Sequence, residues 1–262
     1  NNCKQLKYID LFCGIGGFHQ ALSRFGHKCV FACDKDKHCR KTYEDNYKIK
    51  PEGDITKLNI PEMSDFDILC GGFPCQTFSN AGKKKSTSVP KGQLFLEIIK
   101  IAKNKKPTFM FLENVKHIKK VDGGKAYKMI LDEIRKIGYH IDDDTIFELS
   151  PHQLGIPQQR ERVIFVCIRE DIYDESKKII IPKSNVQICF DSFFETDKAI
   201  INKYKISGDI LNVLNAWDEM IKIFKTNEKL SPTIMCNEFY KNYSDEEFKK
   251  LAIWRQDYIT KN

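Results

Sequence analysis

The stretch FDILCGGFPCQTFS, residues 66–79, decides the fold. It begins with an apolar run that predicts a buried strand, and it continues through two glycines to Pro74 and Cys75. The proline stiffens the chain ahead of the cysteine and removes an N–H group that would need a partner. Loops at the carboxyl ends of parallel strands carry the chemistry of many α/β proteins. Cys75 is therefore either a nucleophile at the mouth of a strand or a buried structural thiol, as most free cysteines are.

A strand, a glycine turn and a helical segment open the chain. Residues 6–12 read as a strand, residues 14–17 (Gly-Ile-Gly-Gly) as a turn, and residues 18–25 as a helix. Glycines let the backbone approach a ligand closely, and a helix N-terminus offers free N–H groups. The spacing is not Gly-x-Gly-x-x-Gly, so the pattern indicates a nucleotide-type ligand without implying a dinucleotide.

Two acidic residues follow at positions that suit such a ligand. Asp34 ends a second predicted strand, residues 27–33, and lies 18 residues beyond Gly16. An acid about 20 residues after the glycine turn is placed to bind ribose hydroxyl groups. Asp54 lies in a third acidic turn, where it would accept a hydrogen bond from an adenine amino group. For Asp34 the alternative is an ordinary solvated aspartate, and the Asp54 turn is a weak signal when taken singly.

The rest of the first 170 residues alternates between strand and helix patterns. The predicted helices are 37–46, 93–105 and 126–137, and the further predicted strands are 108–112, 146–149 and 163–168. This alternation predicts an α/β fold with a doubly wound, mostly parallel sheet. Five strand ends would then bring residues 14–16, Asp34, Asp54, Cys75 and Glu113 to one edge, where ligand and chemistry should meet.

The segment Thr77 to Gly92 is long and polar, with three consecutive lysines at 83–85. A loop of this length inside a domain is usually a functional lid or disordered. Its lysines suit contacts with phosphates, or they form a solvated tip.

Composition narrows the class of protein. The chain has 262 residues, 41% of them hydrophobic, a net charge of +7 and no apolar run long enough to span a membrane. The first residues lack an apolar signal core, so we expect a cytoplasmic location. The ten cysteines are scattered without a Cys-x-x-Cys pair, which favours reduced thiols and no metal site. The excess of lysine and arginine over aspartate and glutamate is compatible with a nucleic-acid partner.

Five segments in order resemble the motif set of the DNA (cytosine-5) methyltransferases, in the form found in bacterial restriction–modification systems. They are residues 10–18, 53–56, 72–79, 113–115 and 158–162, and the resemblance covers residues 6 to about 170. The combination of Phe-Pro-Cys-Gln with Glu-Asn-Val is highly specific. The resemblance implies a Rossmann-like fold that binds S-adenosylmethionine, releases S-adenosylhomocysteine, and methylates a cytosine flipped out of double-stranded DNA.

The resemblance also implies a role for each matching residue. The catalytic set is Cys75 as the nucleophile, Glu113 at ring N3, Asn114 orienting the Cys75 loop, and Arg160 and Arg162 contacting the cytosine oxygen, a phosphate or the partner carboxylate. The cofactor set is Phe12, Gly14, Ile15, Gly16, Gly17, Asp34, Asp54, Ile55, Pro74 and Leu94. No metal is implied.

The sequence departs from the family in three places. Lys35 follows the ribose acid where an aromatic residue is common, and Lys91 replaces an arginine. The segment that closes the cofactor pocket in the family has no counterpart in residues 171–262. We therefore expect a catalytic domain over residues 1–183 and a partial target-recognition region over residues 184–262, apparently truncated, which a downstream segment or a second polypeptide would complete.

Two alternatives stay open. One is a transfer-RNA cytosine-5 methyltransferase of the same fold. The other is a catalytically incomplete protein that binds nucleic acid or serves as one subunit of a split enzyme. The target sequence and an accompanying restriction enzyme cannot be read from these residues.

Overall fold

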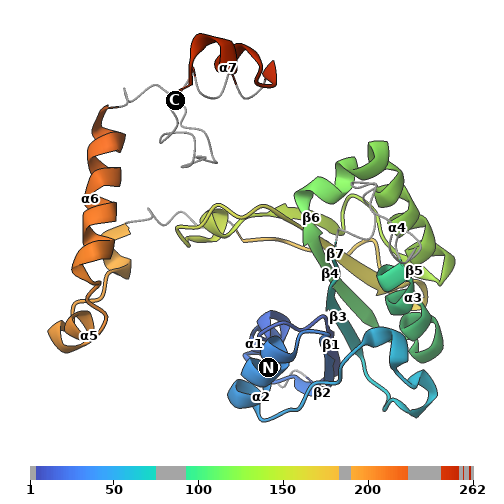
Figure 1. The fold of residues 1–262 in the computed structure, drawn as a ribbon. Helices are drawn as coiled ribbons and strands as arrows, with labels where there is room; N and C mark the ends of the chain where they lie inside the picture. The colour runs from blue at the N-terminus through green and yellow to red at the C-terminus, as the bar shows by residue number, and fades with distance from the viewer. Residues whose placement is uncertain are drawn as a thin grey trace. The chain divides into compact units, whose positions relative to one another are not determined.

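A mixed sheet organises the N-terminal part of the chain (Figure 1). The computed structural model describes residues 4–74, 93–182, 190–223 and 243–253, together with Gln256 and Thr260. In these residues seven strands follow the order β2-β1-β3-β4-β7-β5, with β6 also paired to β7. The strands are β1 (Lys7–Leu11), β2 (Lys28–Cys33), β3 (Ile68–Gly72), β4 (Phe109–Val115), β5 (Tyr139–His140), β6 (Ile146–Leu149) and β7 (Arg162–Arg169).

Helices cover both faces of this sheet, as Figure 1 shows. They are α1 (Gly17–Ser23), α2 (Lys37–Tyr47), α3 (Gln93–Lys105) and α4 (Lys125–Lys136). Helices α3 and α4 pack apolar side chains such as Ile98 and Ile130 into the larger core cluster. Helices α1 and α2 cover the other face, where Tyr43 joins Tyr8 and Ile68 in a smaller cluster. This two-sided covering confirms the predicted α/β class.

The predicted mostly parallel sheet is confirmed among the described residues, with the one strand β7 reversed. Strand β1 pairs in parallel with β2 and β3, and β3 pairs in parallel with β4. Strand β7, however, runs antiparallel to β4, β5 and β6. The connection from β6 to β7 holds only the short 3-10 helix η5 (Pro151–Leu154) and no crossover helix, so it returns the chain antiparallel.

One predicted strand end is wrong. Asp54 does not follow a strand, because the residues before it form only an isolated bridge between Cys33 and Glu52. Asp54 instead caps the 3-10 helix η1 (Ile55–Lys57). Two Pro residues and Gly53 lie within residues 51–61, and this composition disfavours an extended ladder.

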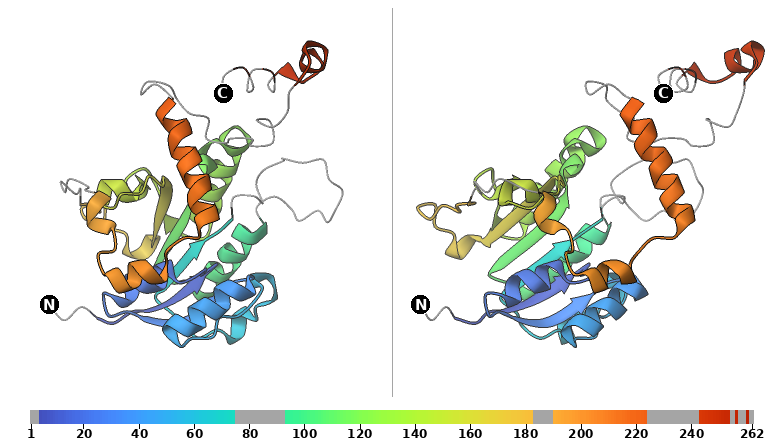
Figure 2. Two further views of the ribbon diagram at one scale, coloured as in Figure 1. Left: turned by 60° about the vertical axis from the view of Figure 1, so that its left-hand side comes forward. Right: turned by 90° about the vertical axis from the view of Figure 1, so that its left-hand side faces the viewer.

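The chain divides into two compact units, residues 1–193 and 194–262. The described helices of the second unit are α5 (Lys198–Lys203), α6 (Gly208–Ile223) and α7 (Asp245–Lys249), drawn in orange to red in Figures 1 and 2. Helix α7 begins at a capping box between Ser244 and Glu247. None of the described helices is both long and apolar enough to cross a membrane. The division predicted at residue 183 stays a prediction.

The described cysteines are mostly part of the core. Six are free thiols, and five of these are buried: Cys13, Cys29, Cys33, Cys70 and Cys167. Burial raises the pKa of the Cys33 thiol to about 12 and also raises that of Cys167. At neutral pH these thiols are protonated and behave as small apolar side chains.

One buried carboxyl group stands out on the α1 and α2 side of the sheet. Asp10 is 1% exposed, and neither carboxylate oxygen has a hydrogen-bond partner. Burial, with a smaller contribution from Asp34, raises its pKa from 3.8 to about 8. The folded protein therefore favours the protonated acid, whereas the unfolded chain ionises near pH 4. Stability contributed by this group falls as pH rises from about 4 to about 8.

Asp10→Asn should therefore stabilise the protein, and more so at high pH. The amide cannot ionise, so it removes the proton that folding must otherwise take up. We expect a larger gain in the urea midpoint at pH 8 than at pH 5. Asp132→Asn, at an exposed position of α4, is the control and should show no such difference. An equal gain from Asp10→Asn at both pH values would contradict the assignment.

Candidate active site

The parallel strands bring four sequence motifs to one edge of the sheet. Leu11 pairs with both Cys33 and Gly71, and Gly72 pairs with Glu113. The glycine turn after β1, Asp34 after β2, the Phe73-Pro74 segment after β3 and the last residues of β4 therefore lie next to one another. This edge is where open α/β sheets bind ligands.

The glycine turn and the phenylalanine ahead of it have left-handed backbone angles, which glycine allows at positions 14 and 16. Phe12, Gly14 and Gly16 have φ values of 54°, 53° and 96°. The Gly16 N–H donates to the Cys13 carbonyl at 2.8 Å, and the Cys13 N–H donates to the Cys33 carbonyl at 3.0 Å. Ile15 is 63% exposed at the tip, and Gly17 begins α1. The turn thus presents exposed backbone beside a helix N-terminus.

Asp34 is tied to this turn. Its Oδ2 accepts from the Gly14 N–H at 2.9 Å, and its Oδ1 accepts from the Asp36 N–H at 2.8 Å. The Arg40 guanidinium holds the Asp34 carbonyl at 2.8 Å. Each carboxylate oxygen keeps further lone-pair capacity, so the acid is oriented and still able to accept from a ligand hydroxyl.

Asp54 lies nearby but is organised differently. Its Oδ1 accepts from the Thr56 N–H at 3.0 Å and from the Thr56 hydroxyl at 2.8 Å, which lower the pKa of the carboxyl group. Lys35 Nζ lies 3.5 Å from its Oδ2. The lysine that replaces an aromatic residue is thus an ion-pair partner of this acid. Ile55, the next residue, is 5% exposed and belongs to the core.

Glu113 and Arg162 form an ion pair across β4 and β7. Arg162 Nε lies 2.6 Å from Glu113 Oε1, and both side chains are largely shielded from solvent. A Cβ atom at position 72 would lie 3.3 Å from Glu113 Oε2, so the glycine on β3 leaves room for the carboxylate. The sequence predicted that Arg162 contacts the cytosine oxygen, a phosphate or the Glu113 carboxylate. The described structure places the Glu113 carboxylate beside it.

Asn114 joins β4 to the segment that follows β3. This side chain is 2% exposed, and its Nδ2 donates to the Phe73 carbonyl at 2.9 Å. Its Oδ1 accepts from the Val115 N–H at 2.9 Å. Asn114 therefore fixes the backbone two residues before Cys75. Cys75 itself lies outside the described residues, as do Thr77 to Gly92, and Leu94 is half-buried at the start of α3.

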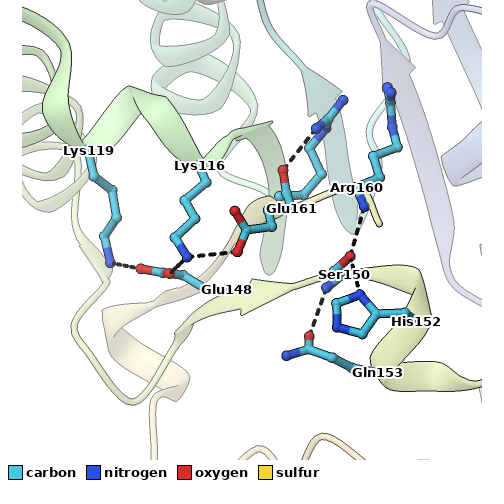
Figure 3. Close-up of polar contacts among 9 residues, drawn as sticks. Lys116, Lys119, Glu148, Ser150, His152, Gln153, Arg160 and Glu161 are labelled. Carbon is cyan, nitrogen blue, oxygen red and sulfur yellow. Dashed lines mark hydrogen bonds and ion pairs between the residues drawn. The ribbon is translucent and has the colours of Figure 1, made fainter. Parts of the chain in front are cut away.

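Arg160 is held through its backbone by a loop that the sequence did not single out (Figure 3). The Ser150 Oγ accepts from the Arg160 N–H at 2.8 Å and lies 2.9 Å from His152 Nδ1. Ser150 is 3% exposed and also forms a capping box with Gln153. In Figure 3 the Arg160 side chain points away from Ser150. A serine before a proline is a common helix start, which is the one signal that would have drawn attention to it.

A second network in Figure 3 flanks the same segment. Lys116 Nζ lies 2.9 Å from Glu161 and 3.1 Å from Glu148, and Lys119 Nζ lies 2.6 Å from Glu148. The two lysines lower the pKa of the Glu148 carboxyl group. Because the two lysines lie on the 3-10 helix η4 (Lys116–Gly124) and their partners are about 30 to 45 residues away, no local pattern could have indicated these pairs.

In the described ranges no group of three or more histidine, cysteine, aspartate or glutamate side chains is placed to hold a metal ion, and the expected absence of a metal stays a prediction.

The family model described as C-5 cytosine-specific DNA methylase matches residues 6–258. The chain belongs to this family. Among curated relatives, the type II methyltransferase M.HhaI of Haemophilus parahaemolyticus is 41% identical over 167 residues, which are 64% of this chain and 50% of the relative. M.HpaII of Haemophilus parainfluenzae is 37% identical over 221 residues, 82% of this chain and 60% of the relative. The chain spans about half the length of the first relatives it matches.

Solved structures support the fold. The Entamoeba histolytica methyltransferase EhMeth matches with a TM-score of 0.61 and 22% identity, over 79% of this chain and 65% of that one. Dnmt2 of S. pombe matches with a TM-score of 0.54 and 22% identity, over 76% and 66%. Membership of the DNA methylase family confirms the resemblance drawn from the five motifs.

Asn114→Ala should lower the free energy of unfolding by about 1–3 kcal/mol, because it removes one partner of the buried hydrogen bond between Asn114 and the Phe73 carbonyl. Urea denaturation measures this loss. Asn59→Ala is the control, since Asn59 is exposed and its side chain makes no capping hydrogen bond at its helix start. A loss no larger than that of the control would contradict the role of Asn114.

Proposed function

We propose that the whole protein transfers a methyl group from S-adenosylmethionine to carbon 5 of a cytosine in double-stranded DNA. The observation that carries this proposal is the Glu113–Arg162 ion pair, beside the Asn114 hydrogen bond to the segment leading into Cys75. An oriented carboxylate and a thiol nucleophile are the two groups that cytosine methylation needs.

Cytosine carbon 5 is too electron-poor to attack a methyl sulfonium unaided. Addition of the Cys75 thiolate to carbon 6 forms a C–S bond and moves the ring electron pair toward carbon 5, which becomes nucleophilic. Carbon 5 then forms the new C–C bond to the methyl group as the methyl–sulfur bond breaks. Loss of the carbon 5 proton expels the thiolate and restores the aromatic ring.

Glu113 would supply the acid–base part of this sequence. Its carboxyl group would hold or protonate ring N3, which offsets the charge that develops on thiolate addition. Arg162 holds that carboxylate in place through the 2.6 Å contact. Arg160 would contact the cytosine oxygen or a phosphate of the DNA backbone.

The described residues fit S-adenosylmethionine, which supplies the activated methyl group when bound. The oriented Asp34 carboxylate would accept from the ribose hydroxyls, and Asp54 with Ile55 would receive the adenine amino end. Phe12 would contact the adenine face, while the turn at Gly14, Ile15, Gly16 and Gly17 would approach the methionine end. Pro74 and Leu94 would line the remaining wall.

The DNA partner follows from the same chemistry. A cytosine inside a duplex cannot reach a thiol at a sheet edge, so the base must be flipped out. The net charge of +7 suits contacts with phosphates, and the loop from Thr77 to Gly92 would close over the flipped base. Recognition of a target sequence requires contacts with base edges, which we assign to residues 184–262 together with residues that the relatives have in addition.

Two other functions would use the same residues. A transfer-RNA cytosine-5 methyltransferase would need the same thiol and carboxyl groups on another substrate. A partner subunit without catalysis would need neither Cys75 nor Glu113 intact. We favour DNA methylation because both groups are present and because the relatives that match at 37–41% identity are named type II methyltransferases.

The test of the function is transfer of radiolabelled methyl groups from S-adenosylmethionine to mixed-sequence DNA, with transfer RNA as a parallel substrate. Residues 1–262 would be assayed alone and with the residues that the relatives have in addition, supplied in the same chain or as a second polypeptide. We expect sequence-specific DNA methylation when those residues are present, and weak cofactor binding and little transfer without them. Incorporation of radiolabelled methyl groups into transfer RNA alone, or into neither substrate, would refute the proposal.

Cys75→Ser should abolish turnover and leave the fold intact. A duplex with 5-fluorocytosine at the target should trap a covalent adduct with the wild-type protein, because fluorine blocks the final proton loss. Denaturing gels measure the adduct. Cys39→Ser removes a half-exposed thiol on α2 and should trap normally. Adduct formation by Cys75→Ser at the wild-type rate would exclude Cys75 as the nucleophile.

Glu113→Gln and Asp34→Ala should have opposite effects. Loss of the acid–base group should slow methyl transfer about 10²-fold or more with little change in cofactor affinity. Loss of the ribose acceptor should weaken S-adenosylmethionine binding and leave turnover at saturating cofactor closer to wild type. Calorimetry and steady-state kinetics separate the two. Equal losses of cofactor affinity in both variants would show that the assigned roles are wrong.

A further inference from the structure

The glycine turn that would receive the cofactor rests on an aromatic side chain that the proposed mechanism does not use. We propose that Tyr47, the last residue of α2, is a positioning residue that fixes this turn for S-adenosylmethionine. The proposal depends on the cofactor named under the proposed function. It rests on contacts among Tyr47, Gly16 and His19.

Tyr47 is in direct contact with the turn. Its hydroxyl donates to the Gly16 carbonyl at 3.2 Å. A Cβ atom at position 16 would lie 2.2 Å from Cε2 of the same ring, and Gly16 has a φ of +96°. The ring therefore occupies the space that a side chain at position 16 would fill. Glycine is required there both for its backbone angle and for this close approach.

The ring cannot move away without opening a buried cluster. His19 stacks on Tyr47 with ring centroids 3.8 Å apart, and Tyr43 meets Tyr47 edge to face at 4.8 Å. His19 Nδ1 lies 2.7 Å from the Tyr43 hydroxyl, and the Tyr8 hydroxyl donates to the His19 carbonyl at 3.3 Å. Tyr8 and Tyr43 are both 0% exposed. The position of Tyr47 is thus set by contacts from β1, α1 and α2.

The same stretch of chain holds the turn at a second point. Asp34, three residues before α2 begins, accepts from the Gly14 N–H, while Tyr47 at the end of α2 donates to Gly16. The two ends of residues 34–47 therefore hold the turn at Gly14 and at Gly16. A turn fixed in this way before binding loses less conformational freedom when the ligand arrives.

Two variants separate what the hydroxyl group and the ring of Tyr47 each contribute to cofactor binding. Tyr47→Phe keeps the ring and removes the hydrogen bond to Gly16, so S-adenosylhomocysteine should bind about threefold to tenfold more weakly. Tyr47→Leu removes the ring as well and should weaken binding further. At saturating cofactor the turnover number should change less than the KM for S-adenosylmethionine, because Tyr47 does not touch the reacting atoms.

The matched control is Tyr43→Phe. It removes a hydroxyl from the same helix and the same cluster, but in the described structure the Tyr43 side chain contacts His19, Cys29 and Tyr47 and not the turn. We expect it to lower the melting temperature and to leave S-adenosylhomocysteine affinity within about twofold of wild type. If Tyr47 only stabilised the fold, the loss of S-adenosylhomocysteine affinity would instead follow the loss of stability in all three variants.

The experiment measures S-adenosylhomocysteine binding by calorimetry and amide hydrogen exchange of residues 14–21 without ligand, under the conditions in which the wild-type protein binds S-adenosylhomocysteine. Faster exchange together with weaker binding in Tyr47→Phe, and neither in Tyr43→Phe, supports the proposal. Wild-type affinity in Tyr47→Phe overturns it, as do parallel affinity losses in both variants. If the wild-type protein binds no S-adenosylhomocysteine, the proposed function fails first, and this inference fails with it. Should Tyr47→Leu not fold, Tyr47→Phe decides the matter.

Discussion

The pairing of Gly72 on β3 with Glu113 on β4 is the constraint on which the rest of the site depends. Because the strands are parallel and in this register, the segment after β3 emerges beside the last residues of β4. Asn114 then lies where it reaches the Phe73 carbonyl, and Glu113 lies where the absence of a side chain at Gly72 admits its carboxylate. A shift of one residue would turn both side chains to the opposite faces of the sheet.

The two faces of the sheet contribute differently. The side of α3 and α4 is almost entirely apolar and has the larger core cluster, so it supplies most of the hydrophobic stabilisation. The side of α1 and α2 buries Asp10, His19, Tyr8 and Tyr43 near the glycine turn, and the half-buried Tyr47 packs against them. Burial lowers the pKa of His19, so its neutral form is favoured within this cluster. Polar groups of this kind cost stability and favour one arrangement of the residues around the turn.

Local patterns were enough to predict much of this architecture. The predicted limits of α3, residues 93–105, are those observed, because its apolar spacing and the following Pro107 leave little choice. The motif residues could be located because glycine turns and strand ends have local signatures. The antiparallel return of β7 and the bridge before Asp54 could not be predicted, since strand direction depends on distant partners. The same holds for Ser150 and Tyr47, whose contacts are made with residues 10 and 31 positions away.

The burial of the cysteines has a consequence for covalent chemistry on this protein. Electrophilic labels react with thiolates, and five of the six described cysteines are both shielded from solvent and held in the thiol form. Cys39 is more accessible, although burial and nearby aspartates raise its pKa as well. Alkylation at neutral pH therefore has a low background across the described part of the chain. A fluorescent maleimide or a cysteine-directed inhibitor would meet few competing thiols there, without any of those cysteines being replaced.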